Sequence, residues 1–208
     1  MFRDRTEAGE KLAEALAARD LPDPVVLALP RGGVPVALPV ARRLAAPLDL
    51  LLVRKIGMPG NRELAAGAVV EGGDPVFNPE VLRYSGLTPQ DFAPDIADKR
   101  RKIAARRAAW LAGRPPVDLT GKTAIVVDDG IATGATVRAA LQGLAARAPA
   151  RIVLAVPVAP ADSLAALAPL CDDLICLDTP ARFYAVGAHY KSFDQFPDAT
   201  VAQLLADG

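Results

Sequence analysis

Residues 123–137 have the sequence TAIVVDDGIATGATV: an apolar run of strand length, two adjacent aspartates, a loop with two glycines and two threonines, and the start of a helix. The free N–H groups of such a loop and of a first helical turn attract anions. Gly130 and Gly134 allow the backbone to come close to a bound group. The hydroxyls of Thr133 and Thr136 can donate to phosphate oxygens or cap the helix. The segment therefore predicts a phosphate-binding loop between a buried strand and a helix.

Two carboxylates stand directly before this loop. Asp128 and Asp129 would repel a phosphate, so we expect them to face vicinal hydroxyl groups or a hydrated Mg²⁺ ion. A phosphate site next to two acceptors for a diol matches the chemistry of a 5-phosphoribosyl group. The competing interpretation is an ordinary turn, in which an aspartate caps the helix and the glycines relieve strain. Other phosphate motifs do not fit, because no lysine follows the loop glycine and no G-x-G-x-x-G follows a strand.

The rest of the chain alternates between short apolar runs and helical stretches. Strands are expected at 25–29, 49–54, 67–71, 123–130, 151–158 and 172–177, and helices at 6–19, 34–45, 89–112, 135–148 and 163–168. Several of the strands are apolar on both faces, which is typical of a parallel sheet covered by helices on both sides. The prediction is an α/β fold with a doubly wound, mostly parallel sheet, in which ligands bind beyond the carboxyl ends of the strands.

The segment 123–137 resembles the phosphoribosyl pyrophosphate (PRPP) signature of type I phosphoribosyltransferases, which is an apolar strand, two acidic residues and a Thr-Gly-x-Thr loop. The resemblance extends in order and spacing from about residue 25 to residue 177. It implies the type I phosphoribosyltransferase fold, with Asp128 and Asp129 holding the ribose hydroxyls and, through water, Mg²⁺. It assigns the 5′-phosphate to the loop residues Gly130, Ile131, Ala132, Thr133, Gly134, Ala135 and Thr136.

A second anion site is expected where the first strand ends. The turn has the sequence Leu29-Pro30-Arg31-Gly32-Gly33. Two glycines and a guanidinium group can form a plain turn or an anion-binding loop. Beside the signature, the turn matches the pyrophosphate loop of the family, formed here by Pro30, Arg31, Gly32 and Gly33. Members of the family often hold a strained or cis non-proline peptide bond there, so one is expected at Pro30-Arg31 or Arg31-Gly32.

Two cations, Arg54 and Lys55, leave the second strand and enter a Gly-rich stretch, 55–68, that is expected to be a long loop. Exposed charges on a solvated loop are the simpler interpretation. By the resemblance, Arg54 and Lys55 are the catalytic cations that neutralise the leaving pyrophosphate, and the loop is a mobile lid over the site. The run Arg-Lys-x-Gly with a following Pro-Gly is similar to adenine phosphoribosyltransferases in particular.

The absence of a carboxylate at position 132 limits which acceptor bases are expected. Ala132 occupies the position at which family members that act on 6-oxopurines carry a carboxylate, so hypoxanthine, guanine and xanthine are disfavoured. If the reaction needs a general base, Glu63 and Glu71 are the candidates.

The C-terminal stretch is rich in aromatic residues, among them Phe183, Tyr184 and Tyr190. In the family a small hood covers the base, and aromatic rings stack on flat ligands. Packing of these rings onto the domain or onto a second subunit is the alternative. The expected organisation is one domain, 1–208, with a core over about 22–178 and a hood formed by about 1–20 and 180–208.

The composition excludes several classes of protein. Lys plus Arg and Asp plus Glu number 24 each, and a net charge of +0 disfavours a nucleic-acid partner. No apolar stretch is long enough to span a bilayer and the N-terminus lacks an apolar signal core, so no membrane contact is expected. Two cysteines, Cys171 and Cys176, cannot form a disulfide framework, and a cytoplasmic location is predicted. The basic stretches 99–102 and 106–107 are expected to be a solvated helix face.

These features predict a phosphoribosyltransferase, a pentosyl-transferring enzyme of nucleotide metabolism. It would move the 5-phosphoribosyl group of Mg-PRPP to a nitrogen nucleophile, a nucleobase or related amine, and release pyrophosphate. Mg²⁺ is the expected cofactor, PRPP and a small-molecule acceptor are the expected ligands, and the family implies a homodimer. The alternative is a PRPP- or nucleotide-sensing regulatory protein without catalysis, and a third hypothesis is a repair or hydrolytic role on ribosyl phosphates.

Overall fold

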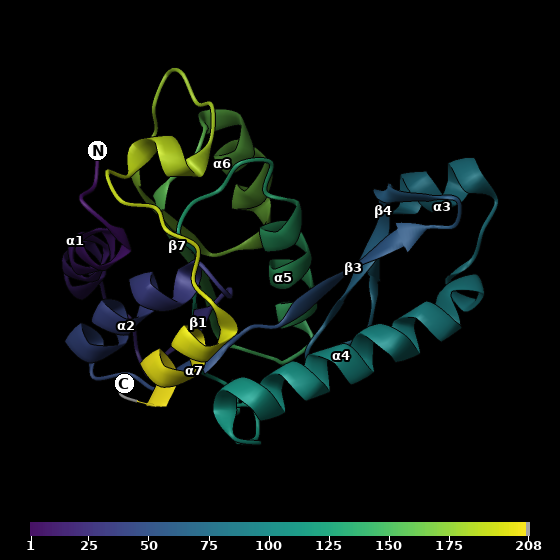
Figure 1. Cartoon of the computed structure of the whole chain (residues 1–208), viewed down its shortest axis with the longest axis horizontal. Coiled ribbons are helices and arrows are strands. Elements are labelled where there is room, and N and C mark those ends of the chain that lie inside the picture. The colour runs from purple at the N-terminus through teal and green to yellow at the C-terminus, as the bar shows by residue number, and fades with distance from the viewer. Residues whose placement is uncertain (207–208) are drawn as a thin grey trace.

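The computed structural model describes residues 1–206, apart from the side chains of Arg62 and Glu63, and contains two sheets (Figure 1). The larger sheet has five parallel strands in the order β2-β1-β6-β7-β8. These strands are β1 (Pro24–Ala28), β2 (Leu48–Leu50), β6 (Thr123–Val127), β7 (Arg151–Val158) and β8 (Asp173–Asp178). All of β6 is buried, which explains its unbroken apolar sequence. The predicted α/β fold with a parallel sheet is confirmed.

Helices cover both faces of this sheet (Figure 1). They are α1 (Arg5–Ala17), α2 (Gly33–Leu44), α5 (Ala135–Ala145) and α6 (Ala161–Leu167), followed by a short 3₁₀ helix, Ala168–Leu170. Neighbouring side chains of β1 point to opposite faces, so Val26 packs with α1 and α2 while Leu27 packs with α5 and α6. Leu12 and Leu16 of α1 are fully buried in the same core cluster as Val26, and the division into a core and a hood stays a prediction.

Residues 53–111 form an arm that projects from the large sheet (Figure 1). The arm contains β3 (Val53–Met58), β4 (Asn61–Val70), β5 (Val76–Phe77), α3 (Pro79–Ser85), a 3₁₀ helix (Pro89–Phe92) and α4 (Ala93–Leu111). Its three strands pair antiparallel. The long loop expected at 55–68 is therefore wrong: the stretch is a hairpin that turns at Pro59 and Gly60, where a φ of 79° suits glycine. The strand expected at 49–54 is likewise divided between β2 and β3, which belong to different sheets.

The last part of the chain returns to the first residues. The backbone N–H of Phe2 donates to the carbonyl of His189 at 2.8 Å, and the N–H of Lys191 donates to the carbonyl of Phe2 at 2.9 Å. A 3₁₀ helix (Val186–His189) precedes this contact, and α7 (Asp198–Ala206) follows it. α7 packs against α2 and α4 and buries Val201 and Leu205. The first residues of the chain therefore lie beside segment 189–192, whereas the described chain ends in α7, next to α2 and α4.

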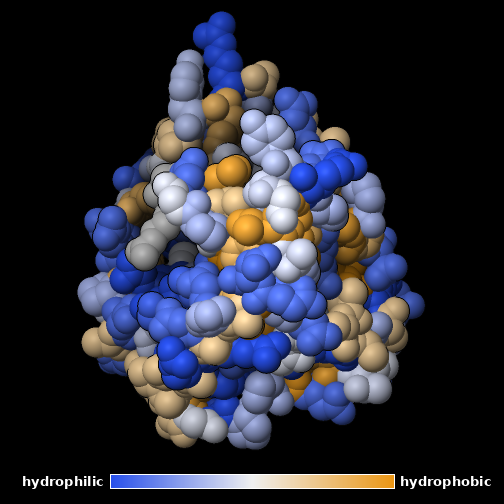
Figure 2. All heavy atoms as spheres, turned by 90° about the vertical axis from the view of Figure 1, so that its right-hand side faces the viewer, coloured by the Kyte–Doolittle hydropathy of each residue, from blue (hydrophilic) through white to orange (hydrophobic). Residues whose placement is uncertain are grey.

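The surface of the arm is mostly polar. In Figure 2, which faces the right-hand side of Figure 1, hydrophilic side chains surround a hydrophobic area near the middle. α4 buries Ile103, Trp110 and Leu111, and its residues 100–102, which are all basic, are exposed. Of the helices in residues 1–206, none combines the length and the apolar character that crossing a membrane requires.

Candidate functional site

The loop after β6 forms a concave site at the carboxyl end of the large sheet. Asp128 and residues 130–137 line a pocket of about 170 Å³, and the loop leads directly into α5. Gly134 precedes the helix with a φ of 73°, a left-handed conformation that favours glycine. The pocket includes Thr133 and Thr136. The predicted loop thus lies at a helix N-terminus, where orphan N–H groups and the helix dipole favour an anion.

Asp128 and Asp129 follow β6 directly and lie next to this pocket. The N–H of Asp129 donates to Oδ1 of Asp128 at 2.8 Å, and Nε of Arg5 donates to Oδ2 of Asp129 at 2.8 Å. Burial and the neighbouring charge of Asp129 hold the pKa of Asp128 well above its usual range. The guanidinium of Arg5 offsets part of that unfavourable charge. The acid pair therefore presents hydrogen-bond acceptors that the protein already holds in place, as a diol site requires.

Arg5 is a site residue that the sequence pattern does not reveal. Its side chain is buried, its Nη1 donates to the carbonyl of Asp194 at 2.9 Å, and its guanidinium lies 3.7 Å from the centroid of the Phe193 ring. Nearby, the hydroxyl of Tyr190 donates to the carbonyl of Asp129 at 2.5 Å. Arg5 and Asp129 are 124 residues apart, so no local motif could have indicated their contact.

The turn after β1 lies against the acid pair. The peptide bond between Pro30 and Arg31 is cis, as the resemblance implied. A Cβ atom on Gly32 would lie 2.0 Å from Oδ2 of Asp129, and one on Gly33 would lie 2.6 Å from the last carbonyl oxygen of β6. The two glycines therefore allow the turn to contact the end of β6, and the two predicted anion sites are neighbours.

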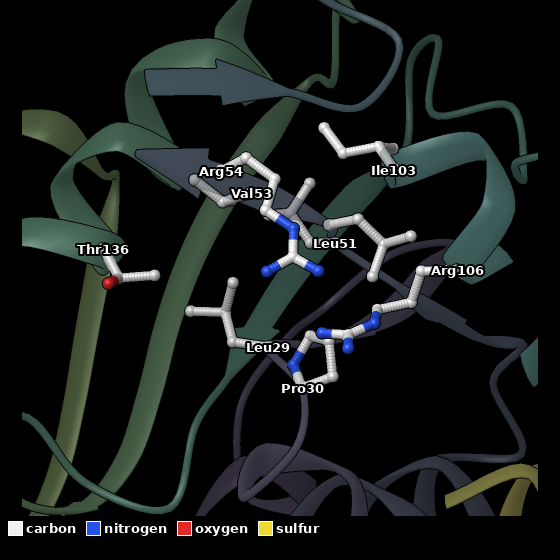
Figure 3. A pocket seen from close by; sticks show the side chains of 9 residues that line it. Leu29, Pro30, Leu51, Val53, Arg54, Ile103, Arg106 and Thr136 are labelled. Atoms are coloured by element: carbon white, nitrogen blue, oxygen red, sulfur yellow. The ribbon is translucent and has the colours of Figure 1, made fainter. Parts of the chain in front are cut away.

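Arg54 lies in a small pocket between the arm and the large sheet. The pocket is lined by Leu29, Pro30, Leu51, Leu52, Val53, Arg54, Ile103, Arg106 and Thr136. Figure 3 shows the guanidinium groups of Arg54 and Arg106 directed into the same space near Pro30. Burial, followed by the charge of Arg106, lowers the pKa of Arg54. The solvated face expected at 106–107 is wrong, because Arg106 lines this pocket and Arg107 is buried.

Arg107 belongs to a buried ion network that joins the arm to the large sheet. Its Nη2 donates to Oδ1 of Asp49 at 2.7 Å, and its Nε lies 3.1 Å from Oε1 of Glu71. Burial, which outweighs the attraction of Arg107, raises the pKa of Glu71 to about 7. Glu71 was one of two candidate bases, and in this structure it is engaged in the network. The side chain of the other, Glu63, lies outside the described residues.

Lys55 is exposed on β3 and lines a larger cavity of about 560 Å³ between the arm and α5. This volume is in the range of small-molecule sites. Thr133 and Thr136 of the phosphate loop also line the cavity, and Thr136 lines the small pocket of Arg54 as well. The structure therefore places the two predicted cations, Arg54 and Lys55, in two cavities that meet at Thr136.

The three aromatic residues expected over the base lie outside these cavities. Tyr190 is buried against Phe2, with ring centroids 5.4 Å apart. Phe183 stacks on His189 at 5.3 Å, and Tyr184 is 83% exposed. None of the three lines the cavities described above. Their contact with a base stays a prediction.

The acid pair is the candidate place for Mg²⁺. Within residues 1–206, no three His, Cys, Asp or Glu side chains are grouped so that they could hold a metal ion. Mg²⁺ commonly takes one or two carboxylates and completes its shell with water and ligand phosphates. Asp128 and Asp129, with an anion pocket beside them, fit that donor set.

The sequence of the chain is similar to those of known proteins. A family model described as "Phosphoribosyl transferase domain" matches residues 4–188. Two Mycobacterium tuberculosis proteins, "Putative phosphoribosyl transferase MT0597" (strain CDC 1551 / Oshkosh) and "Putative phosphoribosyl transferase Rv0571c" (strain ATCC 25618 / H37Rv), are 46% identical to the chain over 207 residues. The match covers 99% of this chain and 46% of each relative, so the chain spans about half the length of the curated relatives it matches.

Solved structures show the same architecture. The crystal structure of TT1426 from Thermus thermophilus has a TM-score of 0.87 and 44% identity, and the match covers 99% of this chain and 98% of that one. The structure of the AQ2163 protein from Aquifex aeolicus has a TM-score of 0.52 at 15% identity, with 88% and 78% of the two chains covered. The second likeness concerns the fold alone.

Proposed function

The chain belongs to the phosphoribosyl transferase domain family, as the sequence resemblance predicted, and we propose that it transfers the 5-phosphoribosyl group of PRPP to a nitrogen nucleophile with release of pyrophosphate. The observation that carries the proposal is the site at the end of β6, where one short segment supplies an anion pocket and an acid pair. A 5-phosphoribosyl group needs both, because its phosphate requires donors and its ribose diol requires acceptors.

Different residues of this segment bind different groups of the ligand. The loop 130–136 binds the 5′-phosphate, with the hydroxyls of Thr133 and Thr136 as donors. Asp128 and Asp129 accept hydrogen bonds from the ribose hydroxyls. The hydrogen bond from Nε of Arg5 to Oδ2 of Asp129, at 2.8 Å, holds this carboxylate in position for the diol.

In the transfer step, the bond between the anomeric carbon and the pyrophosphate oxygen breaks, and pyrophosphate leaves with the electron pair. A bond forms between the acceptor nitrogen and that carbon, and the nitrogen loses a proton to a base or to solvent. Arg31, Arg54 and Lys55 neutralise the charge that develops on pyrophosphate. Mg²⁺, held through water at Asp128 and Asp129, would supply further positive charge to the phosphate oxygens when bound.

The hairpin of β3 and β4 is the candidate lid. Its first strand carries both cations, and the hairpin lines the 560 Å³ cavity together with α5. Water would otherwise take the ribosyl group, so the reaction needs a cover over the anomeric carbon. The proposed lid is therefore the hairpin of β3 and β4, in place of the loop that the sequence predicted.

Calorimetric titration with Mg-PRPP tests the site assignment. Asp128→Asn and Asp129→Asn are each expected to lower PRPP affinity by about tenfold or more, because each replaces an acceptor oxygen of the diol site by an amide donor, and Thr133→Ala is expected to lower it by a smaller factor. Thr120→Ala is the matched control, since Thr120 donates to Asp118 in an exposed turn. Wild-type affinity in all three site variants would show that the assignment is wrong.

Release of pyrophosphate from Mg-PRPP with a panel of acceptors tests the transfer itself. Adenine, uracil, orotate and a simple amine represent the classes of acceptor that remain open, and 6-oxopurines are expected to react poorly because position 132 is alanine. PRPP binding without acceptor-dependent release would support the sensing alternative. The homodimer and the cytoplasmic location stay predictions.

A further inference from the structure

Four charged side chains from four separate elements meet beside the pyrophosphate loop. Arg31 belongs to that loop, Arg54 to β3, Arg106 to α4, and Asp198 begins α7. Oδ1 of Asp198 lies 3.6 Å from Nη1 of Arg31, and Oδ2 of Asp198 lies 3.4 Å from Nη2 of Arg106. One carboxylate thus bridges two guanidinium groups, and a third, that of Arg54, shares a pocket with Arg106 and interacts electrostatically with Asp198.

The charges at this place do not balance. Arg54 and Arg106 point into the same pocket (Figure 3), although two cations of equal charge repel each other. Burial and then the charge of Arg106 lower the pKa of Arg54, whereas the charge of Asp198 raises it. Three cations facing one carboxylate form a site for an additional anion with more than one negative charge.

The guanidinium group of Arg106 is both oriented and accessible for such a ligand. Its guanidinium lies 4.6 Å from the centroid of the Trp110 ring, one helical turn further along α4, and this contact orients the group toward the pocket. Its side chain remains 34% exposed and is therefore accessible. Asp198 is 51% exposed, and ion pairs of this exposure and length are weak, so a ligand with greater charge can replace this carboxylate.

We propose that Arg106 is a diphosphate-binding residue of this chain, and that Asp198 is an internal counter-ion which the diphosphate of the substrate displaces. The inference rests on the proposed function and extends it, because it adds a residue of α4 to the pyrophosphate site and couples that site to α7. On binding, Arg31 and Arg106 exchange the carboxylate for phosphate oxygens, and the first turn of α7 is released. The rest of α7 stays in place through Val201 and Leu205, which are buried.

Titration calorimetry with inorganic diphosphate and Mg²⁺ tests this proposal, and ribose 5-phosphate serves as the second ligand. Arg106→Gln is expected to lower diphosphate affinity by about tenfold or more while changing ribose 5-phosphate affinity by less than about twofold. Asp198→Asn is expected to raise diphosphate affinity by about threefold, most clearly at low salt, because it removes the competitor. Arg101→Gln, an exposed cation on the same helix whose carboxylate partner is Asp98 at 3.5 Å, is the control and should change neither affinity.

The outcomes separate this inference from the proposed function. Normal diphosphate binding by Arg106→Gln, or unchanged binding by Asp198→Asn, would overturn the inference even if PRPP turnover is observed. Absence of saturable diphosphate binding by the wild-type protein would overturn it as well. Arg106-dependent diphosphate binding without any PRPP turnover would support the inference and contradict the transferase proposal. Ribose 5-phosphate binding shows in each variant that the protein has folded, and Arg106→Lys, which keeps the charge, should retain part of the diphosphate affinity.

Discussion

Replacement of Gly32 by alanine probes the contact between the two anion-binding loops. Gly32 has φ −60° and ψ −34°, which alanine adopts freely, so the change adds no backbone strain. The new Cβ atom would lie 2.0 Å from Oδ2, 2.4 Å from Cγ and 2.9 Å from Oδ1 of Asp129, whereas an ordinary contact begins at 3.4 Å. Either the carboxylate or the loop must therefore move by more than an ångström.

Both movements have a cost that the structure allows us to bound. The carboxylate of Asp129 pairs with Arg5 at 2.8 Å, and the two side chains are 14% and 9% exposed. Rotating Asp129 away would leave Arg5 without this partner, which costs about 3–5 kcal/mol for a fully buried pair. Shifting the loop is an overpacking cost of about 1–3 kcal/mol. We therefore expect the loop to shift. The free energy of unfolding should fall by about 2 kcal/mol and the Tm by roughly 4–8 °C for a chain of this length.

A double-mutant cycle identifies the cause. The free energy of unfolding is measured by urea denaturation for Gly32→Ala in the wild-type, Asp129→Ala and Asp128→Ala backgrounds. The three nearest atoms all belong to Asp129, so removing that side chain should reduce the cost of the alanine to below about 0.5 kcal/mol. Asp128→Ala should leave the cost unchanged, and Mg-PRPP affinity should fall in Gly32→Ala. An equal cost in all three backgrounds would refute the reasoning.

Three further predictions concern stability and reactivity. The pKa of Glu71 is about 7 in the folded protein and 4.5 ordinarily, so between these pH values the folded protein binds one proton more at Glu71 than the unfolded chain does. The free energy of unfolding should therefore fall by up to a few kcal/mol as pH rises from 4.5 to 7. In thermal melts, Glu71→Gln should lack this dependence on pH. Arg107→Met removes one partner of a buried ion pair and should cost about 3–5 kcal/mol in urea denaturation, whereas a similar change at the exposed Arg100 should cost less than about 0.5 kcal/mol. Burial raises the pKa of the Cys171 and Cys176 thiols, so native protein should react with iodoacetamide much more slowly than urea-unfolded protein; equal rates would contradict the burial of both groups.

The phosphate loop and the acid pair could be predicted because their determinants are contiguous in sequence. A buried strand must end in a turn, and the residues of that turn necessarily lie together at one edge of the sheet. Asp128, Asp129 and Thr133 are therefore placed by local structure alone. The turn at 30–33 required only one additional step, since parallel strands that pair bring their carboxyl ends side by side.

The helix expected at 89–112 matches α4, but the hairpin of the arm could not be predicted, because its composition is misleading. Leu51 and Leu52 are buried and extend the apolar run of β2, yet the strand ends at Leu50. The hairpin is rich in glycine and polar residues, which by composition alone indicate a loop. At position 67 the structure requires glycine, because a Cβ atom there would lie 2.2 Å from the carbonyl oxygen of Val76 on the paired strand.

The supporting cations could not be predicted because their partners are remote. Arg5 contacts groups 124 and 189 residues away, and neither separation leaves a pattern in the sequence. Arg106 and Arg107 stand in a run of basic residues that is typical of a solvated face. One turns into a pocket and the other into a buried network only because the arm folds back against the large sheet.

The large sequence separation between Arg5 and its partners has a consequence for folding during synthesis. Arg5 is translated before the large sheet, but Tyr190 and Asp194, which enclose it together with Asp129, follow only after β8 has ended at Asp178. A nascent polypeptide released up to that strand has every partner for its parallel sheet and none of the late residues that hold its acidic turn. The contacts that hold the acidic turn are thus completed only after the strands of the scaffold have been made.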